Sequence, residues 1–545
     1  MNNTTPVHAG QVRFLALLRT SLLSLLKVFS FGRGAAKRGA KAAVGALLLI
    51  CALGVYLMGV YSALLASMLD GAGALRLLPA LVSLLACLLA FVFTVPAAGG
   101  IVFGGRDNDL LLALPVSAFE ILLSKVLALY LENLVLTLSM VLTGGVVYLL
   151  YGGPGGGWVL PAALFGGVLL ALLPTLLALL FGYLAAWMGA RLGKQSILGT
   201  LFYLAFFVVV LLGAFQVQNG LAALMRNVDK LAAAMRGPLL PFGLMGRAFA
   251  GGMGAMGALG LLALLLGLPF LLAVWLFSRG YKGIVTRMAA RHGRSDYRLG
   301  ALRAGSPAGA LLKKDALKFF FTPIYLLNCG FGLVVLLIAA AAALIKRDWL
   351  LGLLAQMGYG AGSPMVYALV CGGVLLMLSS ANTASVSLSL EGKYLWILQS
   401  APLPAARILY GKAGFNVLLG LPVLLAAAGA LTFAFGFTPG QLLLLVLAGT
   451  ALLVFLSLLG VWINLCFPKL DAANETIVVK QSLAAMLGML GGMALVGTGA
   501  LLYWLLHSVL PFPVFLLGAA AVLCIGAALL TRTLATAGIA KFRAL

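Results

Sequence analysis

Residues 365–402 read "MVYALVCGGVLLMLSSANTASVSLSLEGKYLWILQSAP", and this stretch contains the pattern that decides the fold. A run of apolar and small residues, 365–390, is followed by a short charged and aromatic stretch, 391–402, that ends at a proline. An α-helix needs about 20 mostly apolar residues to cross a hydrocarbon core roughly 30 Å thick. We therefore predict that the first run spans a membrane and that the second is a connector outside the hydrocarbon.

The rest of the chain repeats this alternation. Of its 545 residues, 63% are hydrophobic and only 9% are charged, and the mean hydropathy is +1.15. A soluble protein of this composition would expose large apolar patches. A membrane β-barrel would show alternating segments of about ten residues, which the sequence lacks. The composition predicts an all-α, polytopic membrane protein of about twelve transmembrane helices in two pseudo-symmetric six-helix halves.

The spans and the domain organisation follow from the apolar runs. The predicted spans are 42–68, 76–103, 121–151, 158–190, 196–216, 251–278, 323–345, 365–390, 408–436, 441–467, 480–506 and 511–531. The predicted parts are an N-terminal cytoplasmic segment with an amphipathic helix (1–41), a first six-helix half (42–279), a basic cytoplasmic linker with a second amphipathic helix (280–322) and a second six-helix half (323–545). The stretch 217–250 is expected to be an external loop with short interfacial or re-entrant pieces.

The net charge of +24 indicates an orientation in the membrane. Nucleic-acid binding is another explanation of so basic a chain. The positive-inside rule, however, also explains where the charges lie. With the N-terminus inside, most of the 36 Lys and Arg residues fall on the cytoplasmic side, above all within 279–318. We expect a multi-pass protein of the plasma membrane, with both termini in the cytoplasm, next to an anionic inner leaflet and without a nucleic-acid partner.

The two halves match each other at an offset of 287 residues. At this offset Gly105 aligns with Gly392, Arg106 with Lys393, Pro115 with Pro402, and Lys125 with Lys412. These matches occur at the same place in each half, between its second and third spans. An even number of spans in each half predicts a parallel repeat, related by an axis along the membrane normal.

The aligned stretches define two connectors, the first being Gly105–Pro115 and the second Glu391–Pro402. Each begins at a charged, glycine-containing turn and continues as a short apolar piece. Pro115 disfavours a helical conformation at Leu114, as Pro402 does at the residue before it. We expect each connector to form a short helix across the membrane surface, exposed to a cytoplasmic partner. The alternative is an ordinary interfacial connector, anchored in the second half by Tyr394 and Trp396.

The amino-acid sequences of these stretches resemble those of a known protein family. "LLLALPVSAFEILLSKVL" (110–127) and "EGKYLWILQSAPLPAARILYGK" (391–412) look like the segment between the second and third spans of type-two ATP-binding cassette (ABC) exporter permeases. "LLKKDALKFFFTPIYLLN" (311–328) and "FPKLDAANETIVVKQS" (467–482) are similar to stretches in a twelve-span branch of these permeases. The resemblance implies a membrane subunit of an ABC exporter with elbow helices at residues 15–27 and about 311–321.

In that family the segment after the second span is a coupling helix that sits in a groove of a cytoplasmic ATPase subunit. The resemblance therefore implies coupling residues in both connectors. They are Gly105, Arg106, Leu114, Pro115, Glu391, Gly392, Lys393, Trp396 and Pro402. The chain itself has no Walker A motif, since the nearest stretch, "GARLGKQS" (189–196), has Gln195 after its Gly-Lys. ATP-Mg is expected on a separate ATPase, in two copies, and this chain is not expected to be an enzyme.

Four further polar residues are candidates for a translocation pathway. Glu132 lies within the third predicted span, where an ionisable residue is a functional candidate by default. It could equally tie its span to a neighbour through a hydrogen bond. In the eighth span, Asn382, Ser385 and Ser389 are expected to share a helix face. They could line the inner end of a pathway or join helices by hydrogen bonds.

The sequence is also compatible with two other classes of function. A secondary transporter also often has six plus six spans and would place ionisable pairs or broken helices at the membrane midplane. A membrane enzyme acting on lipid-linked substrates would need clustered acids or histidines at one interface. The three histidines, His8, His292 and His507, are scattered, and no metal or catalytic constellation is evident in the sequence. The substrate is not readable from the sequence, because the expected pathway is apolar.

Overall fold

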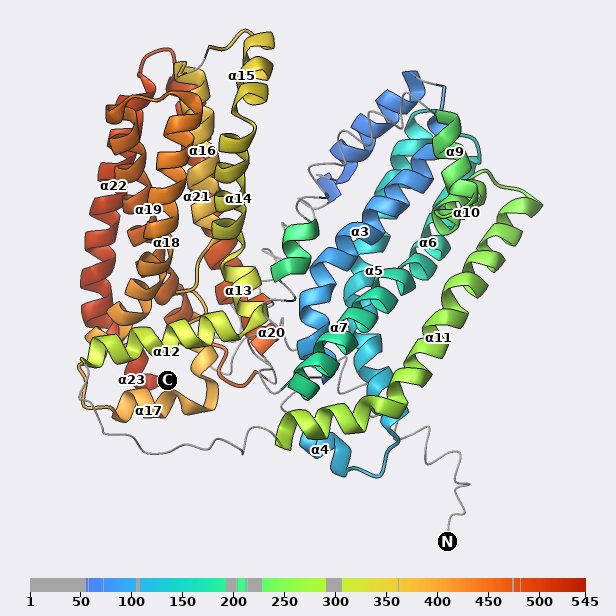
Figure 1. Ribbon diagram of the computed structural model, residues 1–545, viewed down its shortest axis with the longest axis horizontal. Coiled ribbons are helices and arrows are strands. Elements are labelled where there is room, and N and C mark those ends of the chain that lie inside the picture. The colour runs from blue at the N-terminus through green and yellow to red at the C-terminus, as the bar shows by residue number, and fades with distance from the viewer. Residues whose placement is uncertain are drawn as a thin grey trace. The chain divides into compact units, whose positions relative to one another are not determined.

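The computed structural model describes residues 55–56, 58–71, 73–103, 108–192, 202, 204–210, 213, 228–290, 306–360, 362–472, 475–480 and 482–545. The described residues form helices and turns, with no strand among them. The chain divides into two compact units, unit 1 (Met1–Asp296) and unit 2 (Tyr297–Leu545). Both units are bundles of long helices (Figure 1).

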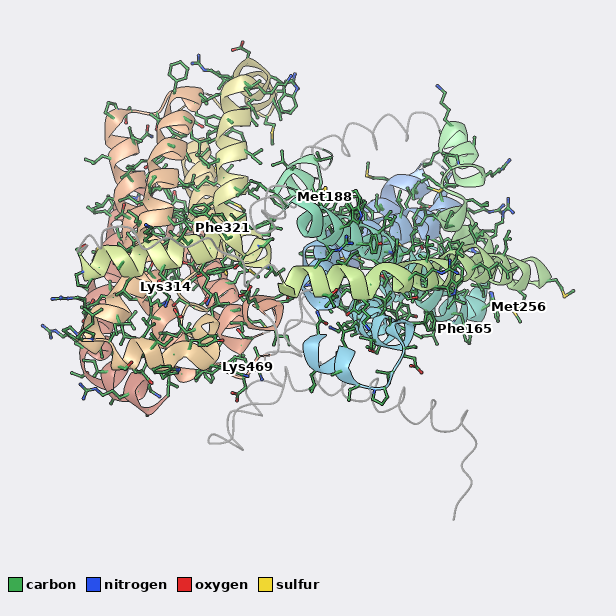
Figure 2. All side chains as sticks on the ribbon, turned by 60° about the horizontal axis from the view of Figure 1, so that its bottom comes forward. Phe165, Met188, Met256, Lys314, Phe321 and Lys469 are labelled. Carbon is green, nitrogen blue, oxygen red and sulfur yellow. The ribbon has the colours of Figure 1, made fainter. Side chains whose placement is uncertain are left out.

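Among the described residues, unit 1 contains a helix over residues 58–71 and eight further helices after it. They are α3 (Leu78–Ala98), α4 (Asn108–Ala113), α5 (Ala118–Leu150), α6 (Val159–Leu170), α7 (Leu172–Leu192), α9 (Val228–Arg236), α10 (Leu240–Phe249) and α11 (Met253–Ala290). A π-helical turn, Gly99–Phe103, extends α3. The described part of the predicted external loop is the pair α9–α10, and α10 packs against α3, α6 and α11. Large apolar side chains such as Phe165 and Met256 remain exposed on the bundle (Figure 2), as expected for a lipid-facing surface.

Unit 2 contains the second connector. Its helices are α12 (Pro307–Phe321), α13 (Pro323–Cys329), α14 (Phe331–Ile345), α15 (Arg347–Gln356), α16 (Pro364–Ser380), α17 (Leu395–Ser400), α18 (Ala405–Phe435), α19 (Pro439–Cys466), α20 (Glu475–Lys480), α21 (Leu483–Leu506), α22 (Phe512–Thr533) and α23 (Ile539–Ala544). The helices α12, α17 and α23 lie at one end of the bundle and α15 at the other (Figure 1). The predicted second amphipathic helix is α12, which turns Leu311, Asp315 and Phe319 inward.

Eight helices of the described residues are long and apolar enough to cross a membrane, and the bent pair α13–α14 makes a ninth. Four of the twelve predicted spans are not among these eight helices. The seventh, 323–345, is bent by 63° at its break, where Gly330 separates α13 from α14. The first and fifth, 42–68 and 196–216, lie largely outside the described residues.

The eighth predicted span, 365–390, is wrong in its second half. Helix α16 ends at Ser380, and Ala381 is extended, with φ −96° and ψ 92°. The sequence that follows is rich in Ser, Thr and Asn, whose side chains compete with the helix for backbone hydrogen bonds. Residues 381–390 are nevertheless buried. Irregular backbone at membrane depth is tolerated where protein surrounds it, and this segment meets that condition.

Candidate functional site

The two connectors contain matching short helices. Adding 287 to the bounds of α4, Asn108–Ala113, gives the bounds of α17, Leu395–Ser400, and the helices that follow begin at Ala118 and Ala405, again 287 apart. After α17 the chain becomes extended at Ala401, directly before Pro402. The predicted short helices are therefore present. Gly105 and Arg106 lie outside the described residues, whereas Leu114 and Pro115 are exposed.

Helix α17 has one buried and one exposed side. Leu395 and Leu398, one turn apart, are buried in an apolar cluster that includes Leu311, Ile408, Leu465 and Phe542. The opposite side presents Tyr394, Trp396 and Ile397, which are 61%, 62% and 49% exposed. Lys393 and Pro402 are also exposed. The amide of Gln399 donates a hydrogen bond to the carbonyl of Phe542 (2.8 Å). The apolar contacts and this bond hold the aromatic surface in one orientation.

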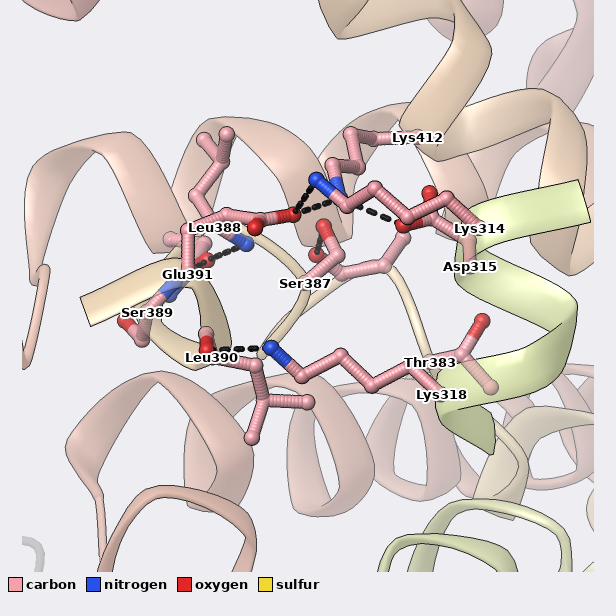
Figure 3. Close-up of polar contacts among 12 residues, drawn as sticks. Lys314, Asp315, Lys318, Thr383, Ser387, Leu388, Ser389, Leu390, Glu391 and Lys412 are labelled. Atoms are coloured by element: carbon pink, nitrogen blue, oxygen red, sulfur yellow. Dashed lines mark hydrogen bonds and ion pairs between the residues drawn. The ribbon is translucent and has the colours of Figure 1, made fainter. Parts of the chain in front are cut away.

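Glu391 does not belong to the exposed surface, contrary to the prediction. Its side chain is only 6% exposed, and its Oε1 lies 2.6 Å from Nζ of Lys412 and 2.7 Å from Nζ of Lys314. Lys412 also donates to Oδ1 of Asp315 at 2.6 Å. Figure 3 shows Lys412 between the two carboxylates, with Lys314 reaching Glu391 from α12. The cluster joins α12, the start of the second connector and α18.

The ion pairs keep Glu391 charged in spite of its burial. Burial alone would raise the pKa of Glu391, but the charge of Lys412, hydrogen bonds from Lys314 and Lys412, and the charge of Lys318 lower it to about 2. Lys318 donates to the backbone carbonyl of Leu390. Burial lowers the pKa of Lys318, and the nearby carboxylates of Glu391 and Glu475 act against that shift. The start of the second connector is thus held both by the side chain of Glu391 and by the backbone carbonyl of Leu390.

Gly392 separates the buried and exposed parts of the second connector. It is itself buried, with φ 55° and ψ −131°. A side chain strains this backbone conformation, so glycine is the residue suited to it. The turn buries Glu391 while Lys393 and Tyr394 face outward. Gly392 therefore lies inside the turn and is not part of the exposed surface.

Asn382, Ser385 and Ser389 do not share a helix face, because α16 ends before them. They are buried and hydrogen-bonded within the protein. The amide of Asn382 donates to the carbonyl of Leu456 (3.2 Å), and its Oδ1 accepts from the backbone N–H of Ser385 (3.2 Å). The hydroxyl of Ser389 accepts from the amide of Asn464 (2.7 Å). These contacts favour a structural role for the three residues over that of wetting a pathway.

Two buried asparagines that the sequence analysis did not select form similar hydrogen-bond chains in the two units. In unit 1, the hydroxyl of Thr94 donates to Oδ1 of Asn133 (2.5 Å), whose amide donates to the hydroxyl of Thr175 (2.9 Å). In unit 2, the hydroxyl of Thr383 donates to Oδ1 of Asn416 (2.8 Å), whose amide donates to the hydroxyl of Ser457 (2.9 Å). Both asparagines lie within apolar predicted spans, and a polar residue in such a span is the sequence feature that would have identified them.

Unit 1 also anchors its connector with a buried lysine. Lys125 is the eighth residue of α5, as Lys412 is of α18. Its Nζ donates to the amide oxygen of Asn108, the first residue of α4. The hydroxyl of Tyr281 on α11 approaches the same oxygen at 3.3 Å. Glu132, a candidate pathway residue, is half-buried on the same helix, about two turns after Lys125.

The site combines an exposed apolar and aromatic surface with buried ion pairs. No group of three His, Cys, Asp or Glu side chains suited to a metal ion occurs among the described residues. The site consists of a small exposed helix that buried ion pairs and polar contacts connect to the spans.

Comparison with known proteins places the chain in a family. The model of a family described as membrane proteins with twelve transmembrane segments matches residues 43–532. No curated protein and no solved structure gave a match. Because the matched region covers most of the 545 residues, this chain belongs to that family of twelve-span membrane proteins.

Proposed function

We propose that this chain is the permease subunit of an ABC exporter and that α4 and α17 dock cytoplasmic ATPase subunits. The observation that carries the proposal is the recurrence of one six-residue helix at the same place in both units, which in unit 2 combines an exposed aromatic side with a buried ionic anchor. A partner that shifts α17 acts on α18 through Lys412 and on α12 through Asp315. These contacts would transmit a movement of the partner to the spans.

The form of α17 favours a protein partner over a lipid anchor. Aromatic residues with nearby Lys or Arg occur both at protein interfaces and at membrane surfaces. A lipid anchor, however, does not need a fixed orientation, whereas a preorganised surface lowers the entropic cost of protein binding. The buried side of α17, the turn at Gly392 and the cluster around Lys412 all restrict its orientation.

In the proposed cycle, ATP-Mg binds to the partner subunits and this chain provides the pathway. Nucleotide binding can shift the permease only if the closed ATPase binds one conformation of the permease more tightly than the other. The connectors are the sites at which that difference in affinity would arise. The substrate is then exported from the cytoplasmic side of the plasma membrane.

Purification of the tagged chain from its native membrane tests the proposal. A stoichiometric ATPase is expected in the preparation. Trp396→Ala should reduce its association about tenfold or more, since buried aromatic residues dominate many interfaces. Trp349→Ala is the matched control, because Trp349 is also 62% exposed but lies on α15, at the other end of unit 2. Equal association of both variants, each confirmed to insert in the membrane, would exclude docking through α17.

A further inference from the structure

Helix α17 has only six residues and therefore depends on the rest of unit 2 for its orientation. Isolated helices shorter than about 12–15 residues are marginal in water. The cluster around Lys412 fixes the chain just before α17, through Glu391. In the second half of α17, the side chain of Gln399 is hydrogen-bonded to a different element, α23.

Helix α23 continues the last predicted span. Helix α22, the π-helical turn Leu534–Gly538 and α23 follow one another without a loop, and Leu534 and Gly538 at the two joins have helical backbone angles. Together they form one helical stretch of 33 residues, Phe512–Ala544. At about 1.5 Å per residue this stretch is about 50 Å long, whereas a hydrocarbon core measures roughly 30 Å. Its end therefore extends beyond the hydrocarbon, at the end of unit 2 where α17 lies (Figure 1).

One side of this end is buried. Leu534, Gly538 and Phe542 recur at every fourth residue and are buried, whereas the three residues between Leu534 and Gly538 are exposed. Phe542 is only 1% exposed. It belongs to the same apolar cluster as Leu395 and Leu398, the two buried residues of α17. The buried sides of α17 and α23 therefore share one core.

Two hydrogen bonds add to this apolar contact. The amide of Gln399 donates to the carbonyl oxygen of Phe542 (2.8 Å), which lies in the last turn of α23. The last four carbonyls of a helix have no partner within that helix, so Gln399 satisfies a group that α23 leaves free. The hydroxyl of Tyr410 on α18 donates to the carbonyl oxygen of Thr531 near the end of α22 (2.9 Å). Both α17 and the helix that follows it are thus bonded to the same helical stretch.

We propose that α23 positions α17 for docking and that Phe542 is the positioning residue. This inference rests on the function proposed above and adds a second route from the partner to the spans: besides α18 and α12, a movement of α17 reaches α22 through α23. The aromatic side of α17 keeps one orientation only while its buried side is packed with Phe542. A preorganised surface binds a protein partner more tightly, because less conformational entropy is lost on binding.

Hydrogen–deuterium exchange of the purified full-length protein tests the positioning without the partner. Phe542→Ala should raise the exchange of the α17 backbone amides about tenfold or more, because it removes a large buried side chain and local opening governs exchange. Leu516→Ala is the matched control. Leu516 is also buried (3% exposed) and lies on the same helical stretch, but it belongs to an apolar cluster that contains no residue of α17. It should change the exchange of α17 by less than about twofold, because distant sites act independently.

Two outcomes of the exchange experiment would overturn the inference. One is unchanged exchange of α17 in Phe542→Ala, and the other is an equal increase in Phe542→Ala and Leu516→Ala. Gln399→Met provides a second variant that leaves the core intact and removes the hydrogen bond to Phe542. It should raise the exchange of α17 about two- to tenfold, the range expected for one hydrogen bond. If Phe542→Ala does not insert in the membrane, unchanged exchange in Gln399→Met would overturn the inference by itself.

Copurification of the ATPase from native membranes tests the consequence for docking. Phe542→Ala should lower the amount of ATPase per permease about tenfold, whereas Leu516→Ala should lower it less than about threefold. Phe542→Leu, which keeps an apolar side chain in the cluster, should retain most of the association. Wild-type association in Phe542→Ala would overturn the inference and leave the proposed function standing. Absence of an ATPase from the wild-type preparation would overturn the proposed function, and the exchange experiment would still decide whether α23 holds α17.

Discussion

Replacement of Lys412 by Met should destabilise unit 2 more than the loss of any exposed charge. Lys412 is 2% exposed and lies 2.6 Å from both Asp315 and Glu391, whose side chains are 8% and 6% exposed. Met has a similar length but no charge, so two carboxylates would remain buried without the cation between them. Breaking a buried ion pair from one side costs about 3–5 kcal/mol.

Thermal unfolding of the purified protein in detergent measures this cost. One kcal/mol shifts the midpoint by about 2–4 °C for a domain of this size, so the expected decrease is about 6–20 °C. Lys314→Met is the control. The Lys314 side chain is 40% exposed, so water can take the place of its ammonium group beside Glu391. This variant should lower the midpoint by no more than about 4 °C, since a partly exposed pair contributes about 0–1 kcal/mol.

The triple variant Lys412→Met/Asp315→Asn/Glu391→Gln separates a buried ion cluster from ordinary packing. Neutralising all three groups together removes the uncompensated charges, so this variant should be more stable than Lys412→Met alone. A triple variant that unfolds at the same temperature as the single variant, or below it, would refute the reasoning. A shift of less than about 3 °C for Lys412→Met would do the same.

Three further predictions concern the same region. The pKa of Glu391 is lowered from 4.5 to about 2, so its contribution to stability, on the order of 3 kcal/mol, is complete above pH 4.5 and is lost as the pH falls toward 2. Unfolding midpoints of the wild type should fall over this range, and those of Glu391→Gln should fall less. Gly492→Ala should cost about 1–3 kcal/mol, because its Cβ would lie 2.7 Å from the carbonyl oxygen of Ser379. Gly491→Ala, with nothing within 4 Å, should be neutral, and equal midpoints for the two would contradict the packing described. Asn416→Leu should cost about 1–3 kcal/mol by leaving its hydrogen-bond partners unsatisfied, and an unchanged midpoint would argue against the polar chain.

The parts of the fold that the sequence predicted correctly depend on short-range properties. Hydropathy over about 20 residues identified the long helices that the structure describes. The glycine, lysine and proline matches revealed the offset of 287, which the structure reproduces in the bounds of α4 and α17. The end of α17 followed from the restriction that Pro402 imposes on the preceding residue.

The parts that it did not predict depend on partners far away in the chain. Apolar content alone predicted that the eighth span continues to residue 390, but the helix ends at Ser380. In the irregular segment that follows, the side chains of Asn416 and Asn464, which lie on other helices, accept hydrogen bonds from the backbone. Glu391 looked like a surface charge because its partners are Lys412, 21 residues away, and Lys314 on α12. Burial of a charge becomes tolerable only once such partners surround it.

The amino-acid sequence by itself determined that this is a helical, many-span membrane protein with a repeated connector, because hydropathy and proline act locally along the chain. Tertiary structure alone decided which connector residues face outward and which form the buried cluster. The physical reason is that the free energy of a buried charge depends on groups brought to it by folding, and these lie on helices distant in sequence.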